Sequence, residues 1–217
     1  MSSSQIVEIA RRGPGRPPVR SDEETLQLIL EAAADAFRDD GFAGTPMSAV
    51  AHRAGVSTKT LYRLVPTKAE LFRRVIINRI EQFVLEVDQP DEGMEGLQAA
   101  LERLLTAYGT LTLAPDVLAT FRLVVSETCR FPELGKTFYE DALRRTAEIM
   151  AAWLERQCRL GRIRLDDPLL AAGMLRGMMV LEPLRAALLG QAPPPDAEHI
   201  AERARSCAAV FLRGCAV

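Results

Sequence analysis

Residues 41–72 read GFAGTPMSAVAHRAGVSTKTLYRLVPTKAELF, and they predict two short helices on either side of a tight turn. Thr45 is placed to cap the first helix, Pro46 suits its first turn, and Gly55 ends it. Ser57 is placed to cap the second helix directly after this turn. The stretch is therefore predicted to fold as a helix-turn-helix unit.

The second of these helices has two different faces. Its apolar side chains recur at helical spacing and are predicted to point inward: Leu61, Leu64 and Val65. Its outward face carries polar and basic side chains: Lys59, Tyr62 and Arg63. A short helix with such a face, packed on a second helix, has the layout that enters a DNA major groove.

Longer helices flank the unit. Upstream, Ser21 and Glu24 form a capping box, and apolar residues repeat at helical spacing until Asp40, where Gly41 stops the helix. Downstream, residues 67–70 form a second capping box that starts a long helix. Further helices are predicted at roughly 94–113, 115–129, 132–160, 167–190 and 196–214. No strand pattern occurs, so the predicted fold class is all-α.

Composition divides the chain into three parts. Residues 1–20 are rich in Ser, Gly, Pro and Arg and are predicted to be a flexible basic arm. Residues 21–88 are predicted to be the helix-turn-helix domain, including the start of a linking helix. A polar stretch with Pro90 and Gly93 then leads into a larger antiparallel helical domain, residues 89–217.

The charge is uneven along the chain although the net charge is only -2. Residues 1–80 carry 12 Lys/Arg against 9 Asp/Glu, whereas residues 81–217 carry 15 against 20. Two windows without acidic residues lie between Ile9 and Ser21 and between Gly41 and Ala69. An anionic partner is therefore expected at the N-terminal part, with chance as the alternative explanation.

Several classes of protein are not favoured. No apolar run fits a membrane span or a secretory signal, so a cytoplasmic protein without membrane contact is expected. The four cysteines are widely spaced without a CxxC pair, which predicts neither a metal site nor a disulfide framework. No glycine-rich phosphate loop, HExxH or GxSxG occurs, so neither an enzyme nor a cofactor is expected.

Residues 41–72 closely resemble the DNA-binding domain of the TetR family of bacterial transcription regulators, and the resemblance extends over about residues 21–85. The matched positions include Phe37, Gly41, Phe42, Thr45, Val50, Ala51, Ala54, Gly55, Val56, Ser57, Thr60, Leu61, Tyr62, Lys68 and Leu71. The chain departs from the family pattern at Leu64 and Val65, and Leu64 removes a frequent phosphate contact.

The resemblance implies which residues contact DNA. Residues at the start of the third helix would enter the groove: Ser57, Thr58, Lys59 and Thr60. Residues matched to backbone contacts are Thr45, Tyr62 and Lys68, and Arg63 is a further candidate beside them. The alternatives remain open, with Ser57 and Thr45 as caps only, Tyr62 as a packing residue and Lys68 as a solvated charge.

The basic arm contains Gly15-Arg16-Pro17-Pro18, which resembles half of an AT-hook. Such a segment lays an extended Gly-Arg-Pro core in a narrow minor groove, and Arg16 would make the contact. The alternative is that the segment is only a linker.

Residues 121–143, FRLVVSETCRFPELGKTFYEDAL, resemble the C-terminal domain of the multidrug-responsive, AcrR-like branch of the family. The resemblance implies an apolar ligand pocket among helices. Candidate lining residues are Leu101, Leu105, Tyr108, Phe121, Val125, Met150, Trp153, Met174 and Met178. Each of them could instead be an ordinary core residue.

The last two predicted helices carry more apolar residues than one narrow stripe needs. Those of the first helix are Leu169, Leu170, Met174, Leu175, Met178, Met179, Leu181 and Leu188. Gly173 and Gly177 would let a second backbone approach closely. These helices are predicted to pair with their own copy in a homodimer, unless they only fill the core of one subunit.

Together these features predict a repressor that binds a near-palindromic, double-stranded DNA operator as a homodimer and is released by a small, largely apolar effector. One alternative is a nonspecific or architectural DNA-binding protein without an effector. Activation rather than repression is another.

Overall fold

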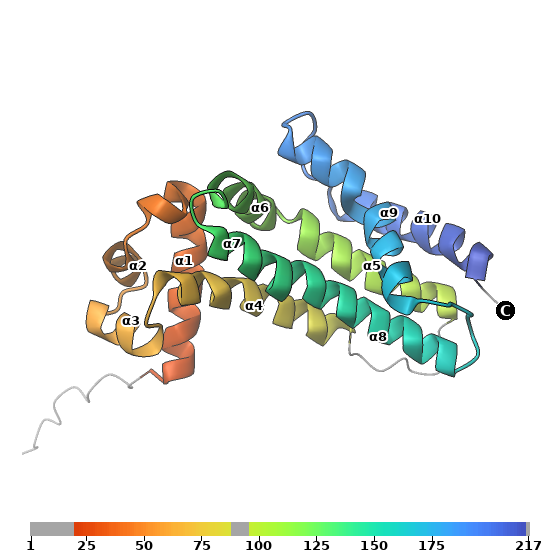
Figure 1. Cartoon of the computed structure of the whole chain (residues 1–217), viewed down its shortest axis with the longest axis horizontal. Coiled ribbons are helices and arrows are strands. Elements are labelled where there is room, and N and C mark those ends of the chain that lie inside the picture. Colours follow the sequence, from red (N-terminus) through yellow and green to blue (C-terminus); the bar gives the residue numbers. More distant parts are fainter. Residues whose placement is uncertain (1–19, 88–95, 216–217) are drawn as a thin grey trace, which may run out of the picture.

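The computed structural model describes residues 20–87 and 96–215, and every regular element in these ranges is a helix. Figure 1 shows the first three helices gathered at one end, with long helices running away from them. The predicted all-α fold class is confirmed for the described part of the chain.

The N-terminal helices are α1 (Asp22–Gly44), α2 (Met47–Arg53), α3 (Thr58–Leu64) and α4 (Lys68–Val87). The capping box at the start of α1 is formed as predicted, because the Glu24 N–H donates to Ser21 Oγ over 3.1 Å and the Ser21 N–H donates to Glu24 Oε2 over 2.8 Å. Gly41, with φ at 73°, interrupts α1 at the predicted stop, and one short turn continues to Gly44.

The C-terminal helices are α5 (Leu97–Leu113), α6 (Pro115–Glu127), α7 (Pro132–Thr137), η1 (Phe138–Arg144), α8 (Arg145–Arg159), α9 (Pro168–Leu188) and α10 (Ala197–Cys215). Their bounds lie within a few residues of the predicted ones. α7, the π-helical segment η1 and α8 follow one another directly and correspond to the single helix predicted over 132–160.

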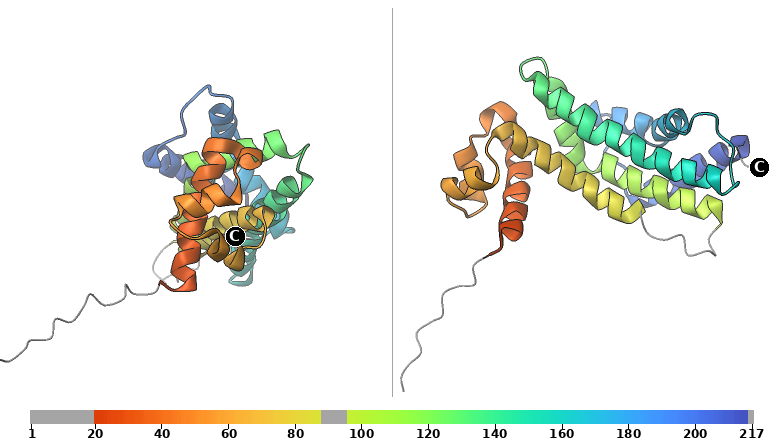
Figure 2. Two further views of the ribbon diagram at one scale, coloured as in Figure 1. Left: turned by 90° about the vertical axis from the view of Figure 1, so that its left-hand side faces the viewer. Right: turned by 60° about the horizontal axis from the view of Figure 1, so that its bottom comes forward.

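The long helices pack in layers. α4 and η1 lie against each other, α5 packs on α4, and α9 and α10 cover α8 and α5 (Figure 2). Within the described ranges, no single helix is long and apolar enough to cross a membrane, although the bent pair α5 and α6 meets the length and composition test jointly.

Two buried apolar clusters form the interior. One lies among α4, α5, α8, α9 and α10 and includes Leu105 and Met150, both 0% exposed. The other fills the space between α1 and α4 and also takes in Val124, Leu134 and Phe138 from α6, α7 and η1. The N-terminal helices therefore share their core with part of the C-terminal region, across the domain boundary predicted along the sequence.

A proline inside α9 is accommodated by a side chain from α10. Pro183 has no N–H, so the Met179 carbonyl one turn earlier lacks its intrahelical donor. Arg203 supplies that donor, because its Nε lies 2.7 Å from the Met179 oxygen and its Nη2 lies 2.7 Å from the Met178 oxygen. Arg203 therefore joins α10 to the bend of α9.

Replacing Arg203 tests this contact. Arg203→Met keeps an unbranched stem but removes every donor, and we expect the free energy of unfolding to fall by about 1–3 kcal/mol because a carbonyl loses its partner. Urea unfolding at one fixed protein concentration measures the change. Arg205→Met, at an exposed position of the same helix, is the matched control. An equal fall in the free energy of unfolding of both variants would contradict the role of Arg203 as the donor to α9.

Candidate functional site

α3 is held firmly by its inward side. Leu61 and Val65 are 0% exposed, and Leu64 is partly buried, as predicted. The turn before α3 is closed by the Val56 N–H, which donates to the Ala51 carbonyl over 3.0 Å, and Gly55 has a positive φ of 66° that other residues rarely adopt. The angle between α2 and α3 is therefore fixed by packing and backbone geometry together.

The outward side of α3 presents Thr58, Lys59 and Tyr62, and the Tyr62 side chain is 49% exposed. Ser57 and Thr60 have a second task, because the Thr60 N–H donates to Ser57 Oγ over 3.0 Å and the two hydroxyl oxygens lie 2.8 Å apart. The predicted cap of α3 is confirmed. Lys59 and Tyr62 are the long side chains on this face that can reach furthest toward a nucleic acid.

Arg63 points outward but is engaged in an ion pair. Its Nη1 and Nη2 donate to the two carboxylate oxygens of Asp22, each over 2.7 Å. This hydrogen bond holds the pKa of the Asp22 carboxyl below its usual value. Arg63 thus ties α3 to the first turn of α1, and a DNA contact by Arg63 would compete with this pair. Arg16, the other basic candidate, lies outside the described residues.

Thr45 requires a correction. Pro46, not Thr45, is the N-cap residue of α2 and makes no side-chain cap hydrogen bond. The Thr45 side chain is 0% exposed, and its hydroxyl donates to the carbonyls of Gly41 over 2.7 Å and Ala36 over 3.1 Å. Its side chain therefore stabilises the end of α1 and is not accessible to a phosphate.

Lys68 also differs from the prediction. Its Nζ donates to the carbonyls of Phe42 over 2.7 Å and Thr45 over 3.0 Å, and it lies 4.7 Å from the centroid of the Phe42 ring. Burial lowers the pKa of this ammonium, and the Glu127 carboxylate acts in the opposite direction. Lys68 therefore caps the end of α1, and a phosphate contact by Lys68 would compete with these bonds.

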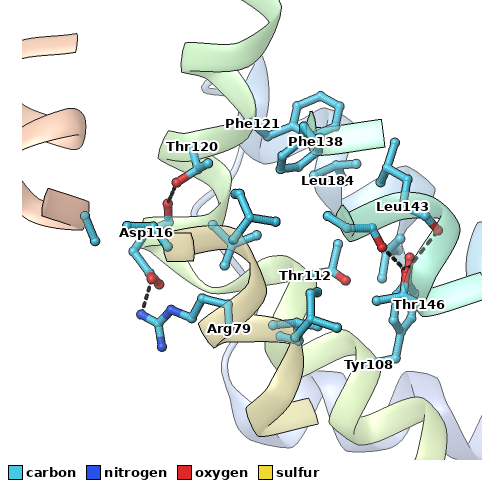
Figure 3. A pocket seen from close by; sticks show the side chains of 18 residues that line it. Arg79, Tyr108, Thr112, Asp116, Thr120, Phe121, Phe138, Leu143, Thr146 and Leu184 are labelled. Carbon is cyan, nitrogen blue, oxygen red and sulfur yellow. Dashed lines mark hydrogen bonds and ion pairs between the residues drawn. The ribbon is translucent and has the colours of Figure 1, made fainter. Parts of the chain in front are cut away.

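A cavity of about 110 Å³ lies where the N-terminal and C-terminal helices meet (Figure 3). Its wall takes residues from α1, α4, α5, α6, η1, α8 and α9. The wall is mainly apolar and includes Val75, Ile76, Ile80, Phe121, Phe138 and Leu184. π-helical turns often occur at functional sites, and here η1 contributes directly to the wall.

The polar groups of the wall are mostly bonded to protein. Arg79 of α4 forms an ion pair with Asp116 in the first turn of α6. The Thr146 hydroxyl donates to the Ala142 carbonyl over 2.8 Å, and the Tyr108 hydroxyl accepts from an Arg176 nitrogen over 3.1 Å. Such a cavity suits a small molecule that is largely apolar.

Two of the nine residues predicted to line a pocket belong to this cavity: Tyr108 and Phe121. Five others lie in the C-terminal core or pack against it: Leu101, Leu105, Met150, Trp153 and Met178. The remaining two are exposed at the surface, Val125 by 64% and Met174 by 58%. These seven do not line this cavity. They were predicted from helical periodicity, which identifies an apolar side chain but not the neighbour that it faces.

The sequence analysis missed the residues that α4 contributes to the cavity. These residues are Val75, Ile76, Arg79 and Ile80, and none of them was a candidate lining residue. Val75 and Ile76 also pack in the core under α1, so helical periodicity alone does not separate packing from cavity lining.

A helix-turn-helix unit packed on a larger helical region, with a cavity between them, places the chain among helix-turn-helix DNA-binding proteins. A sequence profile described as bacterial regulatory proteins, tetR family, matches residues 29–75, and one described as AefR-like transcriptional repressor, C-terminal domain, matches residues 99–215. The chain therefore belongs to the TetR family, whose members are non-enzymatic DNA-binding transcription factors. The C-terminal match is AefR-like, whereas the residue pattern had indicated an AcrR-like branch.

Curated relatives agree with this assignment. The HTH-type transcriptional repressor DrrR1 of Streptomyces coeruleorubidus is 37% identical over 101 residues, which cover 46% of this chain and 36% of DrrR1. The transcriptional activator FasR of Mycolicibacterium smegmatis is 33% identical over 42% of this chain and 47% of its own length. The regulator YhgD of Bacillus subtilis is 25% identical over 81% of this chain and 90% of YhgD. The chain thus spans less than half of the first two relatives.

Solved structures share the fold over most of the chain. A TetR-family regulator from Mesorhizobium loti has a TM-score of 0.76 at 24% identity, covering 92% of this chain and 100% of its own. The flavonoid-responsive regulator FrrA has a TM-score of 0.71 at 28% identity, covering 89% and 98%.

The role of Lys68 can be tested against the phosphate contact that was expected. Lys68→Met removes the donor to the end of α1, so we expect the free energy of unfolding to fall by about 1–3 kcal/mol. The slope of log affinity for DNA against log salt should stay unchanged, whereas loss of a phosphate contact lowers it by about 1. Urea unfolding and fluorescence anisotropy at several salt concentrations measure the two quantities. A reduced slope with unchanged stability would restore the phosphate contact.

Proposed function

We propose that the protein is a homodimeric transcriptional repressor that binds a near-palindromic operator in double-stranded DNA and is released by a small, largely apolar effector. The observation that carries this proposal is the position of the cavity. One side of its wall belongs to α4 and to Ala34 of α1, and the rest belongs to α5, α6, η1, α8 and α9. A molecule bound there contacts the DNA-binding helices and the sensing helices at once.

Release of DNA follows from the spacing of the two copies of α3. A dimer that reads successive major grooves holds its recognition helices about 34 Å apart. An effector that binds more tightly to a conformation with another spacing shifts the protein toward that conformation and lowers its affinity for the operator. Because the coupling is reciprocal, operator DNA lowers the affinity for the effector by the same factor. A 100-fold effect corresponds to about 2.7 kcal/mol of coupling, which is within the usual range.

On the DNA side, Lys59 is assigned to a guanine, whose O6 and N7 both accept from an ammonium. Thr58 offers a hydroxyl and a methyl group to a base edge, and Tyr62 is assigned to the DNA backbone. Ser57, Thr60 and Arg63 lie beside them and remain candidates for contacts made in addition to their present bonds.

Repression is preferred because the C-terminal match is described as a transcriptional repressor domain and DrrR1 is named a repressor. FasR is named an activator, so activation is the second candidate function. A reporter gene behind the bound promoter, with and without the protein, distinguishes them by the sign of the change. The site of action is the cytoplasm, where bacterial DNA is accessible.

Dimerisation is assigned to α9 and α10, as the apolar excess of these helices predicts. Apolar side chains that one protomer leaves exposed on α9 are Leu169, Leu170, Met174 and Leu181. A Cβ added at Gly173 or Gly177 would meet nothing within 4 Å in the protomer, so the protomer itself has room for a larger residue at both. Small residues beside an exposed apolar face are suited to close packing with a second copy.

The operator contact of Lys59 is tested by Lys59→Ala. Loss of a base contact should weaken binding to the native site by about 1–3 kcal/mol while changing the affinity for scrambled DNA much less. Fluorescence anisotropy with DNA from the protein's own upstream region, at two salt concentrations, measures both affinities. Lys136→Ala, which removes an exposed lysine from α7, is the matched control.

The two results that contradict operator recognition are distinct. Equal affinity of the native protein for both DNAs would favour the nonspecific or architectural alternative. An equal loss of affinity for the native site in the Lys59 and Lys136 variants would show that α3 does not make the base contact.

The dimer interface is tested by Met174→Glu. A carboxylate at this exposed apolar position should leave the protomer folded but block the interface, since burying an unpaired charge is costly. Sedimentation velocity at micromolar concentration should then give a monomer. Val125→Glu makes the same change on α6, where the side chain is 64% exposed, and should leave a dimer. A dimer in both variants would place the interface elsewhere.

A further inference from the structure

The volume of the cavity limits the part of a ligand that it can enclose. An apolar protein cavity of about 150 Å³ holds one benzene molecule. The cavity here measures about 110 Å³ and is partly open to solvent, so the part of a ligand that it covers is about the size of one aromatic ring. A larger effector would have its remaining part outside the enclosed space.

The charges in the wall cancel. Among the described residues that line the cavity, Arg79 and Asp116 are the side chains charged at neutral pH, and they form an ion pair with each other. The Thr120 hydroxyl donates to the Asp116 backbone carbonyl over 2.9 Å and so holds the first turn of α6 in place. Figure 3 shows the pair at one end of the cavity, opposite Phe121 and Phe138.

A charged ligand is disfavoured by this arrangement. It would leave its own charge without a partner in mainly apolar surroundings, or it would have to compete with an ion pair that is already formed. A neutral ligand avoids both costs.

Thr112 supplies a hydrogen-bonding group that the wall does not use. Within the described part of the chain its hydroxyl makes no hydrogen bond, whereas the hydroxyls of Tyr108, Thr120 and Thr146 all do. Figure 3 shows Thr112 in the wall without a marked bond. A polar group of a ligand can therefore bond to Thr112 without displacing a contact within the protein.

We propose that the effector is an uncharged molecule whose enclosed part is about one aromatic ring in size and carries one hydrogen-bonding group directed at Thr112. This inference rests on the proposed function, in which the cavity is the effector site. It adds the charge, the size and the polar anchor of the molecule that the cavity selects.

Four probes of similar size separate these properties: para-cresol, toluene, benzoate and benzylamine. At neutral pH the first two are uncharged, the third is an anion and the fourth is a cation. We expect para-cresol to bind at least about tenfold more tightly than either ion, and several-fold more tightly than toluene, in isothermal titration calorimetry with the full-length protein.

Two variants assign the preference to the named residues. Thr112→Val should remove the advantage of para-cresol over toluene, whereas Thr110→Val, at an exposed position of the same helix, should keep it. Asp116→Asn keeps the side-chain shape but removes the negative charge of the wall, which repels an anion, so benzoate should gain about several-fold relative to para-cresol. Thermal unfolding and circular dichroism of each variant establish that it is folded.

The outcomes separate this inference from the proposed function. Tighter binding of benzoate or benzylamine than of para-cresol to the native protein would overturn the inference and leave the cavity as the effector site. Binding of none of the four would overturn both assignments. Operator binding, measured without any probe, stands or falls independently of either result.

Discussion

The contact on which the rest of the architecture depends is the packing of Phe42 against Phe131. Their ring centroids lie 5.3 Å apart, and Phe42 also packs on Phe37 and Phe72 at 5.6 and 5.9 Å. Phe42 and Phe72 are only 3% and 1% exposed, so pulling the two parts of the chain apart would bring large apolar surfaces into water. The helix-turn-helix unit is therefore not an independent module beside a sensor but shares one core with α6, α7 and η1.

The cavity lies along the same join, and this location explains how a small molecule can influence a distant surface. Phe138 belongs both to the shared core and to the cavity wall, and Phe121 packs on it at a centroid distance of 5.5 Å. Arg73 of α4 donates to Asp141 of η1 over 3.0 Å beside this wall. A ligand that widens the cavity therefore has to move α4 or η1, and both are attached to the packing under α1.

Local signals were sufficient for the helices and insufficient for the site. The Ser21 box, the Ser57 cap and the stop at Gly41 act through neighbours in the sequence, so they could be predicted from it. The bonds of Thr45 and Lys68 were not predicted. The Thr45 hydroxyl folds back on the carbonyls of Ala36 and Gly41 at the interruption of α1, and the carbonyl partners of Lys68 become its neighbours only after α1 and α4 pack together. The α4 residues of the cavity wall were missed because the sequence predicts which side chains of α4 are buried but not which of them face a cavity.

The way α3 is fastened determines what kind of change an effector can cause. Its cap, the buried Leu61 and the Arg63 pair with Asp22 all bind it to the same unit as α1, so unfolding α3 alone would sacrifice every one of these contacts. Moving α1 to α3 as one body relative to α8 and α9 breaks none of them. Rigid displacement of the unit therefore keeps every contact of α3, and in the proposed dimer through α9 and α10 it would change the distance between the two copies of α3 without altering the surface that each presents to DNA.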